Sequence, residues 1–66
     1  MKHHWVKLDD GSSALWRGQL ITGYYVFPNN EMWWVMKLGH GQTAGPYAQE
    51  SDAKREAVAQ AKEEGL

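Results

Sequence analysis

The chain has 66 residues, no cysteine, four tryptophans and a formal net charge of −1, from seven Lys and Arg against eight Asp and Glu. Folding at this length buries only about 60% of the unfolded surface, so we expect one domain over residues 1–66 and no deep catalytic cavity. The lack of cysteine excludes disulfides, thiolate metal sites and thiol nucleophiles, and it suits a reducing cytoplasm. Because no apolar run reaches the roughly 20 residues of a membrane span and no secretory signal precedes the first strand, we expect a cytoplasmic domain without membrane association.

The front of the chain is predicted to form a sheet, because all eight aromatic residues lie within the first 47 residues and aromatic side chains favour strands. Asp9-Asp10-Gly11 predicts a hairpin turn between a strand at 5–8 and a return strand at 14–20. Gly18 and Gly23 indicate bends or bulges, and the sequence leaves the start of the next strand open.

A second hairpin is the strongest local signal in the sequence. Residues 24–27 and 32–38 are rich in aromatic and branched side chains and flank a turn at Pro28-Asn29-Asn30-Glu31. A glycine-rich turn then leads into a short segment at 42–45. We expect this segment to be an edge strand, because Pro46 cannot donate a hydrogen bond to a ladder.

The end of the chain is predicted to be a helix over about 49–64. Apolar residues recur there at the spacing of one helical face, namely Ala53, Ala57, Val58 and Ala61. The expected fold class is therefore α+β: an antiparallel β-meander of three to five strands, at about 3–45, with one C-terminal α-helix packed on one face.

One such helix can cover only one of the two apolar sheet faces. Trp33, Val35 and Lys37 alternate along their strand with the residues of the other face, and we expect these three, with Tyr25, on the uncovered side. Alternation leaves the parity open, and a one-residue bulge near Gly18 or Gly23 would exchange the faces of its strand. An uncovered apolar face has three explanations: the N-terminal hairpin folds over it, two copies pair through it, or a partner binds it.

The sequence offers no residue set for catalysis, metal binding or a cofactor. His3 and His4 are adjacent on a strand and point to opposite faces, while His40 lies between two turn glycines. The pair Gly39 and Gly41 lacks the third glycine of a phosphate-binding motif. We therefore expect no enzyme, no catalytic or metal site and no cofactor.

Several motifs of the second half resemble small modules with a three-stranded sheet and one helix. The quoted residues are the strand at 32–38, a glycine-rich turn, Gly45-Pro46-Tyr47 and the helix start Asp52-Ala53-Lys54. They resemble plant AP2-type domains, the N-terminal arm-binding domains of tyrosine integrases and the bacterial cell-division modulator CedA. In those families the sheet face away from the helix reads DNA, whereas this chain places only Arg17 and Lys37 on its exposed strands. The size is also similar to that of phage-encoded accessory proteins.

The residues lead to a first hypothesis of a non-enzymatic binding module, an adaptor or modulator. Its aromatic sheet face would dock on a protein partner. An alternative is DNA binding by the same face, since residues 1–48 carry a net charge of +1 from four basic against three acidic side chains. A second alternative is a homodimer. The expected binding residues are Trp33, Val35, Lys37, Tyr25, Arg17 and Lys7.

Overall fold

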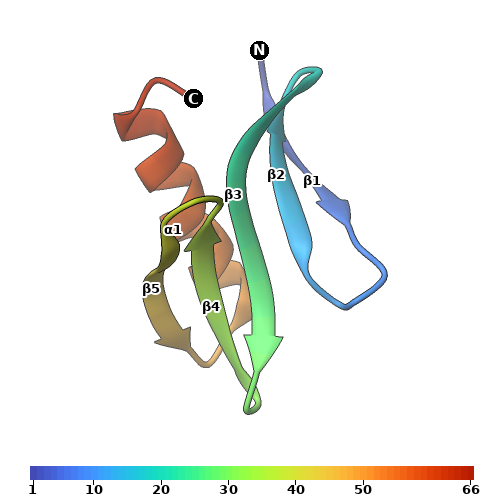
Figure 1. Cartoon of the computed structure of the whole chain (residues 1–66), viewed down its shortest axis with the longest axis vertical. Helices are drawn as coiled ribbons and strands as arrows, with labels where there is room; N and C mark the ends of the chain where they lie inside the picture. Colours follow the sequence, from blue (N-terminus) through green and yellow to red (C-terminus); the bar gives the residue numbers. More distant parts are fainter.

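The computed structural model describes all 66 residues and contains one antiparallel sheet and one helix (Figure 1). The elements are β1 (His3–Lys7), β2 (Ser13–Arg17), β3 (Leu20–Asn29), β4 (Met32–Lys37), β5 (Gly41–Tyr47) and α1 (Glu50–Glu63). The strands are hydrogen-bonded in the order β1-β2-β3-β4-β5, which is a simple meander. The predicted α+β class is confirmed, with five strands at the upper limit of the expected range. The helix is too short and too polar to cross a membrane.

Turn residues set where the strands end. The expected strand at 14–20 is divided at Gly18, whose φ of 59° supplies the left-handed backbone that the β2–β3 turn needs. At the β3–β4 turn, only Asn30 and Glu31 stand between the paired strands. Their φ values are 55° and 63°, which is the backbone of a two-residue hairpin turn with positive φ at both positions.

The β2–β3 ladder contains an irregularity that preserves the faces of both strands. Ala14 pairs with Tyr25 and Trp16 pairs with Ile21, so two steps along β2 correspond to four steps along β3. The extra length lies around Gly23, whose φ is 90°. Because the excess is two residues rather than one, side chains on both sides of it keep their face.

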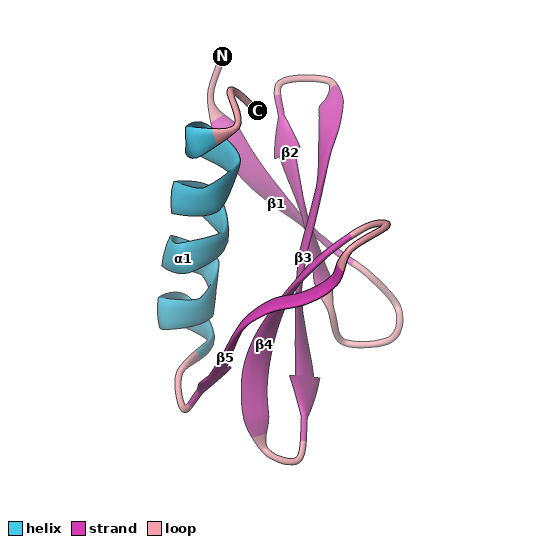
Figure 2. Ribbon diagram, turned by 60° about the vertical axis from the view of Figure 1, so that its left-hand side comes forward, coloured by secondary structure: helices cyan, strands magenta, loops and turns pink.

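The helix lies along one face of the sheet and packs on β3, β4 and β5 (Figure 2). Of the four residues predicted on its apolar face, Ala53, Ala57 and Ala61 are buried and Val58 is half-buried. These alanines let the helix approach closely, and the larger sheet side chains fill the space beneath it. The sheet contributes Leu15, Tyr24, Val26 and Val35 to this core.

The helix ends close to the start of the chain. Gly65, with a φ of 77°, lets the backbone turn after the last helical residue, and its N–H donates to the Lys62 carbonyl at 3.0 Å. His3 Nε2 then donates to the backbone oxygen of Leu66 at 2.8 Å. Both ends of the chain therefore lie together, as Figure 2 shows.

Candidate binding surfaces

The sheet face away from α1, which we call the open face, carries most of the large aromatic and thioether side chains. Tyr25 and Phe27 of β3 alternate with the core residues Tyr24 and Val26, so they lie on the side that the helix does not cover. Along β4, Met32, Trp34 and Met36 alternate with Trp33 and Val35 in the same way. These open-face side chains are half-buried, although no element packs over them.

A hollow of about 400 Å³ lies on this face, which we call the open-face hollow. Its lining residues are Leu8, Asp10, Ser12, Tyr25, Phe27, Met36 and Leu38. Five of the seven are apolar, and none is Lys or Arg. The loop between β1 and β2 borders the hollow without closing it, since Leu8 keeps 37% and Leu38 keeps 68% of its surface exposed. The N-terminal hairpin thus extends the sheet and does not fold over the open face.

Asp10 is the one charged residue at the edge of this hollow. Its carboxylate accepts hydrogen bonds from the Ser12 hydroxyl at 2.5 Å and from the Ser12 backbone N–H at 2.9 Å. These bonds, the hydroxyl first, hold the pKa of Asp10 below its ordinary value of 3.8. The carboxylate is therefore ionised at neutral pH and places a negative charge beside an apolar hollow.

Trp34 is fixed at the β5 side of the open face. Its indole N–H donates to the Asn29 carbonyl at 3.1 Å. The ring lies against the backbone of Gly45, where a Cβ atom would stand 2.9 Å from the Trp34 ring. Gly45 also has a φ of 121°, so both space and backbone conformation require glycine there.

The parity expected from the sequence is wrong for β4. Trp33, Val35 and Lys37 lie on the helix side of the sheet, where Val35 is fully buried and Trp33 packs against the core. Lys37 forms an ion pair with Glu64 just after the helix, and its Nζ lies 5.4 Å from the Tyr24 ring centroid. The error arises because alternation separates two faces without saying which one the helix covers.

The other expected binding residues are divided between the two faces. Tyr25 lies on the open face, as expected. In the β1–β2 ladder, Arg17 stands opposite His3 and Lys7 stands opposite Ser13. Arg17 and Lys7 therefore both lie on the helix side of the sheet. The six residues therefore do not form one surface.

Sequence reasoning missed the other contributors to the open-face hollow. Phe27 and Met36 follow from the same alternation once Val26 and Val35 are known to be core. Leu8 and Leu38 stand just outside the strands. Leu38 continues the alternation of Met36, and its N–H donates to the Gly23 carbonyl of β3 at 2.8 Å. Leu8 lies in the β1–β2 loop, whose position the alternation does not predict.

Comparisons with known proteins do not assign this chain to a family. A scan against models of protein families, a search of curated proteins and a search of solved structures each gave no significant match. The resemblance to AP2-type, integrase and CedA-like modules therefore stays an expectation.

Proposed function

We propose that this chain is a non-enzymatic binding module whose open face docks on a protein partner. The observation that carries the proposal is the open-face hollow, an apolar recess between Tyr25, Phe27 and Met36 that no part of the chain fills. Aromatic and methionine side chains are enriched in the centres of protein interfaces. The hollow is of a size to receive one large apolar side chain of the partner.

The charges around the hollow specify the partner further. Asp10 is ionised at its rim, and its neighbour Asp9 is exposed in the same loop. No Lys or Arg lines the hollow. The partner chemistry that fits is an apolar anchor, such as Leu or Phe, next to Lys or Arg.

DNA binding by this face has less support. The three cations expected to contact phosphate, Arg17, Lys37 and Lys7, are on the helix side of the sheet. A face without Lys or Arg lacks the charges that give nucleic-acid affinity. Pairing of two copies through the open face is the remaining alternative, and the experiment below separates it from partner binding.

The test uses two leucines that are equally exposed at different places. Leu38 lines the hollow and is 68% exposed, whereas Leu20 is 69% exposed and lies outside it. Short fluorescent peptides with a central Phe flanked by Lys serve as the probe. We expect Leu38→Gln to weaken their binding about tenfold, as loss of an interface anchor does, and Leu20→Gln to leave it unchanged.

Fluorescence polarisation gives the affinities, and circular dichroism shows that both variants are folded. Peptides with Ser in place of Phe, or Glu in place of Lys, should not bind. Equal weakening by both substitutions, or no binding by any peptide, would contradict the proposal. A dimer in sedimentation that Leu38→Gln abolishes would assign the face to a second copy instead.

A further inference from the structure

Five of the seven Lys and Arg residues line two adjoining hollows between β1 and α1, on the side of the molecule away from the open face. They are Lys2, Arg17, Lys54, Arg55 and Lys62. No Asp or Glu lines either hollow. For a chain with a net charge of −1, this is a marked separation of charge.

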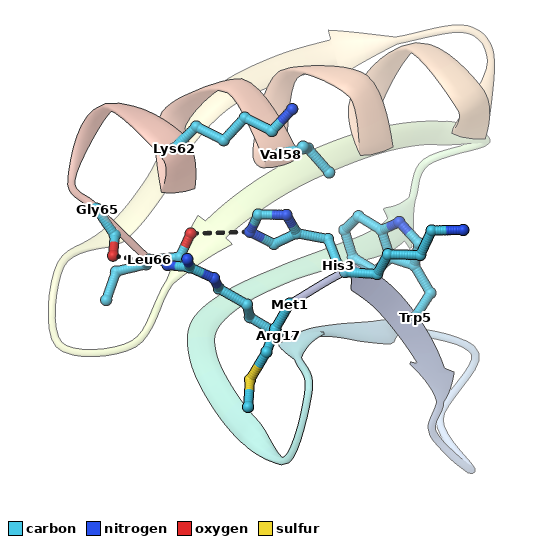
Figure 3. A pocket seen from close by; sticks show the side chains of 9 residues that line it. Met1, His3, Trp5, Arg17, Val58, Lys62, Gly65 and Leu66 are labelled. Carbon is cyan, nitrogen blue, oxygen red and sulfur yellow. Dashed lines mark hydrogen bonds between the residues drawn. The ribbon is translucent and has the colours of Figure 1, made fainter.

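The larger of the two, which we call the terminal hollow, has a volume of about 810 Å³ (Figure 3). Its cations come from β2, from α1 and from the segment before β1. The register of β1 with β2 sets His3 opposite Arg17, Lys2 precedes β1, and Lys62 comes from the last turn of α1. Because the helix packs mainly on β3, β4 and β5, the space towards β1 stays open.

No Asp or Glu side chain pairs with the cations of the terminal hollow. Lys2 and Lys62 form no ion pair. Arg17 donates one hydrogen bond to the Gly65 carbonyl at 3.1 Å, which holds the guanidinium without cancelling its charge. In the smaller hollow, by contrast, Lys54 and Arg55 pair with Glu50 and Asp52 at 3.5 and 3.1 Å. The surplus of positive charge is therefore in the terminal hollow.

The wall that the two hollows share consists of two apolar residues, Trp5 and Val58, and of Lys62. Lys54 Nζ lies 5.3 Å from the Trp5 ring centroid. This contact sets a cation against the indole ring and helps to fix it as a wall. A ligand in the terminal hollow would meet the side chains of Lys2, Arg17 and Lys62 and the apolar surface of Trp5 and Val58.

We propose that the terminal hollow binds the phosphate group of a nucleotide-sized ligand. Three Lys and Arg side chains around one recess suit a group with two negative charges, whereas a single carboxylate would leave positive charges unpaired. The volume falls within the roughly 300–1,000 Å³ of small-molecule sites. Trp5 and Val58 provide the surface for the rest of the ligand.

The experiment measures binding of adenosine monophosphate by calorimetry to the wild type and to Lys62→Gln. Removal of one charge-assisted contact should weaken binding about tenfold. Lys7→Gln is the matched control, because Lys7 is exposed, lies outside both hollows and changes the net charge equally. We expect this control to bind like the wild type, and higher salt to weaken binding to every form that binds.

Two further probes define the ligand. Inorganic pyrophosphate should bind and compete with adenosine monophosphate, whereas adenosine should not bind. Equal affinity for adenosine and its monophosphate would overturn the phosphate assignment. Equal weakening of binding by Lys7→Gln and Lys62→Gln would show that the ligand is attracted by net charge alone and not bound in the terminal hollow. Binding of a single-stranded oligonucleotide without binding of the monophosphate would replace the nucleotide by a nucleic acid.

Discussion

Asp10 and Ser12 are joined by two hydrogen bonds in the β1–β2 loop. Ser12 is buried, with 5% of its surface exposed, and both its hydroxyl and its backbone N–H point to the same carboxylate oxygen. This arrangement stabilises the charged form and orders the β1–β2 loop beside the open-face hollow. The two bonds from Ser12 thus fix the position of the Asp10 charge beside the hollow.

We predict that Ser12→Ala raises the pKa of Asp10 toward its ordinary value of 3.8. The pKa of Asp10 is lower in the folded state than in the unfolded state. Its ionised carboxylate therefore contributes fully to stability when the pH is above the ordinary pKa of Asp. That contribution is lost as the pH falls through the folded-state pKa. The free-energy difference between wild type and variant should therefore be larger at about pH 7 than at about pH 2.

An NMR titration of the Asp10 carboxyl gives the pKa, and urea unfolding gives the free energies. Ser13→Ala is the control, because Ser13 is equally buried and makes no bond to Asp10. An unchanged Asp10 pKa in Ser12→Ala would show that the hydroxyl is not the cause of the shift.

At the scale of elements, the alanine stripe of α1 determines how near the helix lies to the sheet. Ala57 is fully buried against a core that includes Val26 and Val35, and the helix has no larger buried residue. On the covered face of β4, Val35 is fully buried beneath the helix and Trp33 packs beside it against the same core. Met32, Trp34 and Met36 lie on the open face.

We predict that Ala57→Leu destabilises the protein by about 1–3 kcal/mol, because the added atoms overfill a packed interface. Ala59→Leu, on the exposed side of the same helix, should change the free energy of unfolding by no more than about 0.5 kcal/mol. Urea unfolding of the two variants makes the comparison. Equal effects would mean that the helix does not pack as tightly as the structure shows.

At the scale of the whole molecule, the helix supports one part of the sheet more than the other. It packs on β3, β4 and β5, while β1 and β2 contact it less, through Trp5 and Leu15, and are held to the residues after the helix by two hydrogen bonds. These are the hydrogen bonds of His3 to Leu66 and of Arg17 to Gly65. The β1–β2 hairpin should therefore open more readily than the rest.

We predict that backbone amides of β4 exchange with solvent more slowly than those of β2. Both strands have a hydrogen-bonded neighbour on each side, so the comparison isolates the contribution of the helix. Native-state hydrogen exchange measured by NMR provides the test. Equal protection, or slower exchange in β2, would show that the sheet and helix open as one unit.

Much of the fold follows from the sequence because its signals are local. The positions of the second hairpin, the edge strand and the helix agree with the structure, and the three alanines that we expected on one helical face are buried. The open face was predicted from the sequence only in part. Tyr25 was placed on the correct face, whereas Trp33, Val35 and Lys37 were placed on the wrong one. Alternation has a two-fold ambiguity, and the sequence contains no local signal that resolves it.

The sequence by itself determined the type and order of the elements, an alanine-faced helix and a sheet with two apolar sides, because turn residues and side-chain periodicity act over a few positions. Only the tertiary structure decided which side the helix covers, since that choice depends on the fit of Val35 and its neighbours beneath the alanines. It also brought Lys2, Arg17 and Lys62 around one hollow. Residues so far apart in the chain meet only when the whole meander has folded.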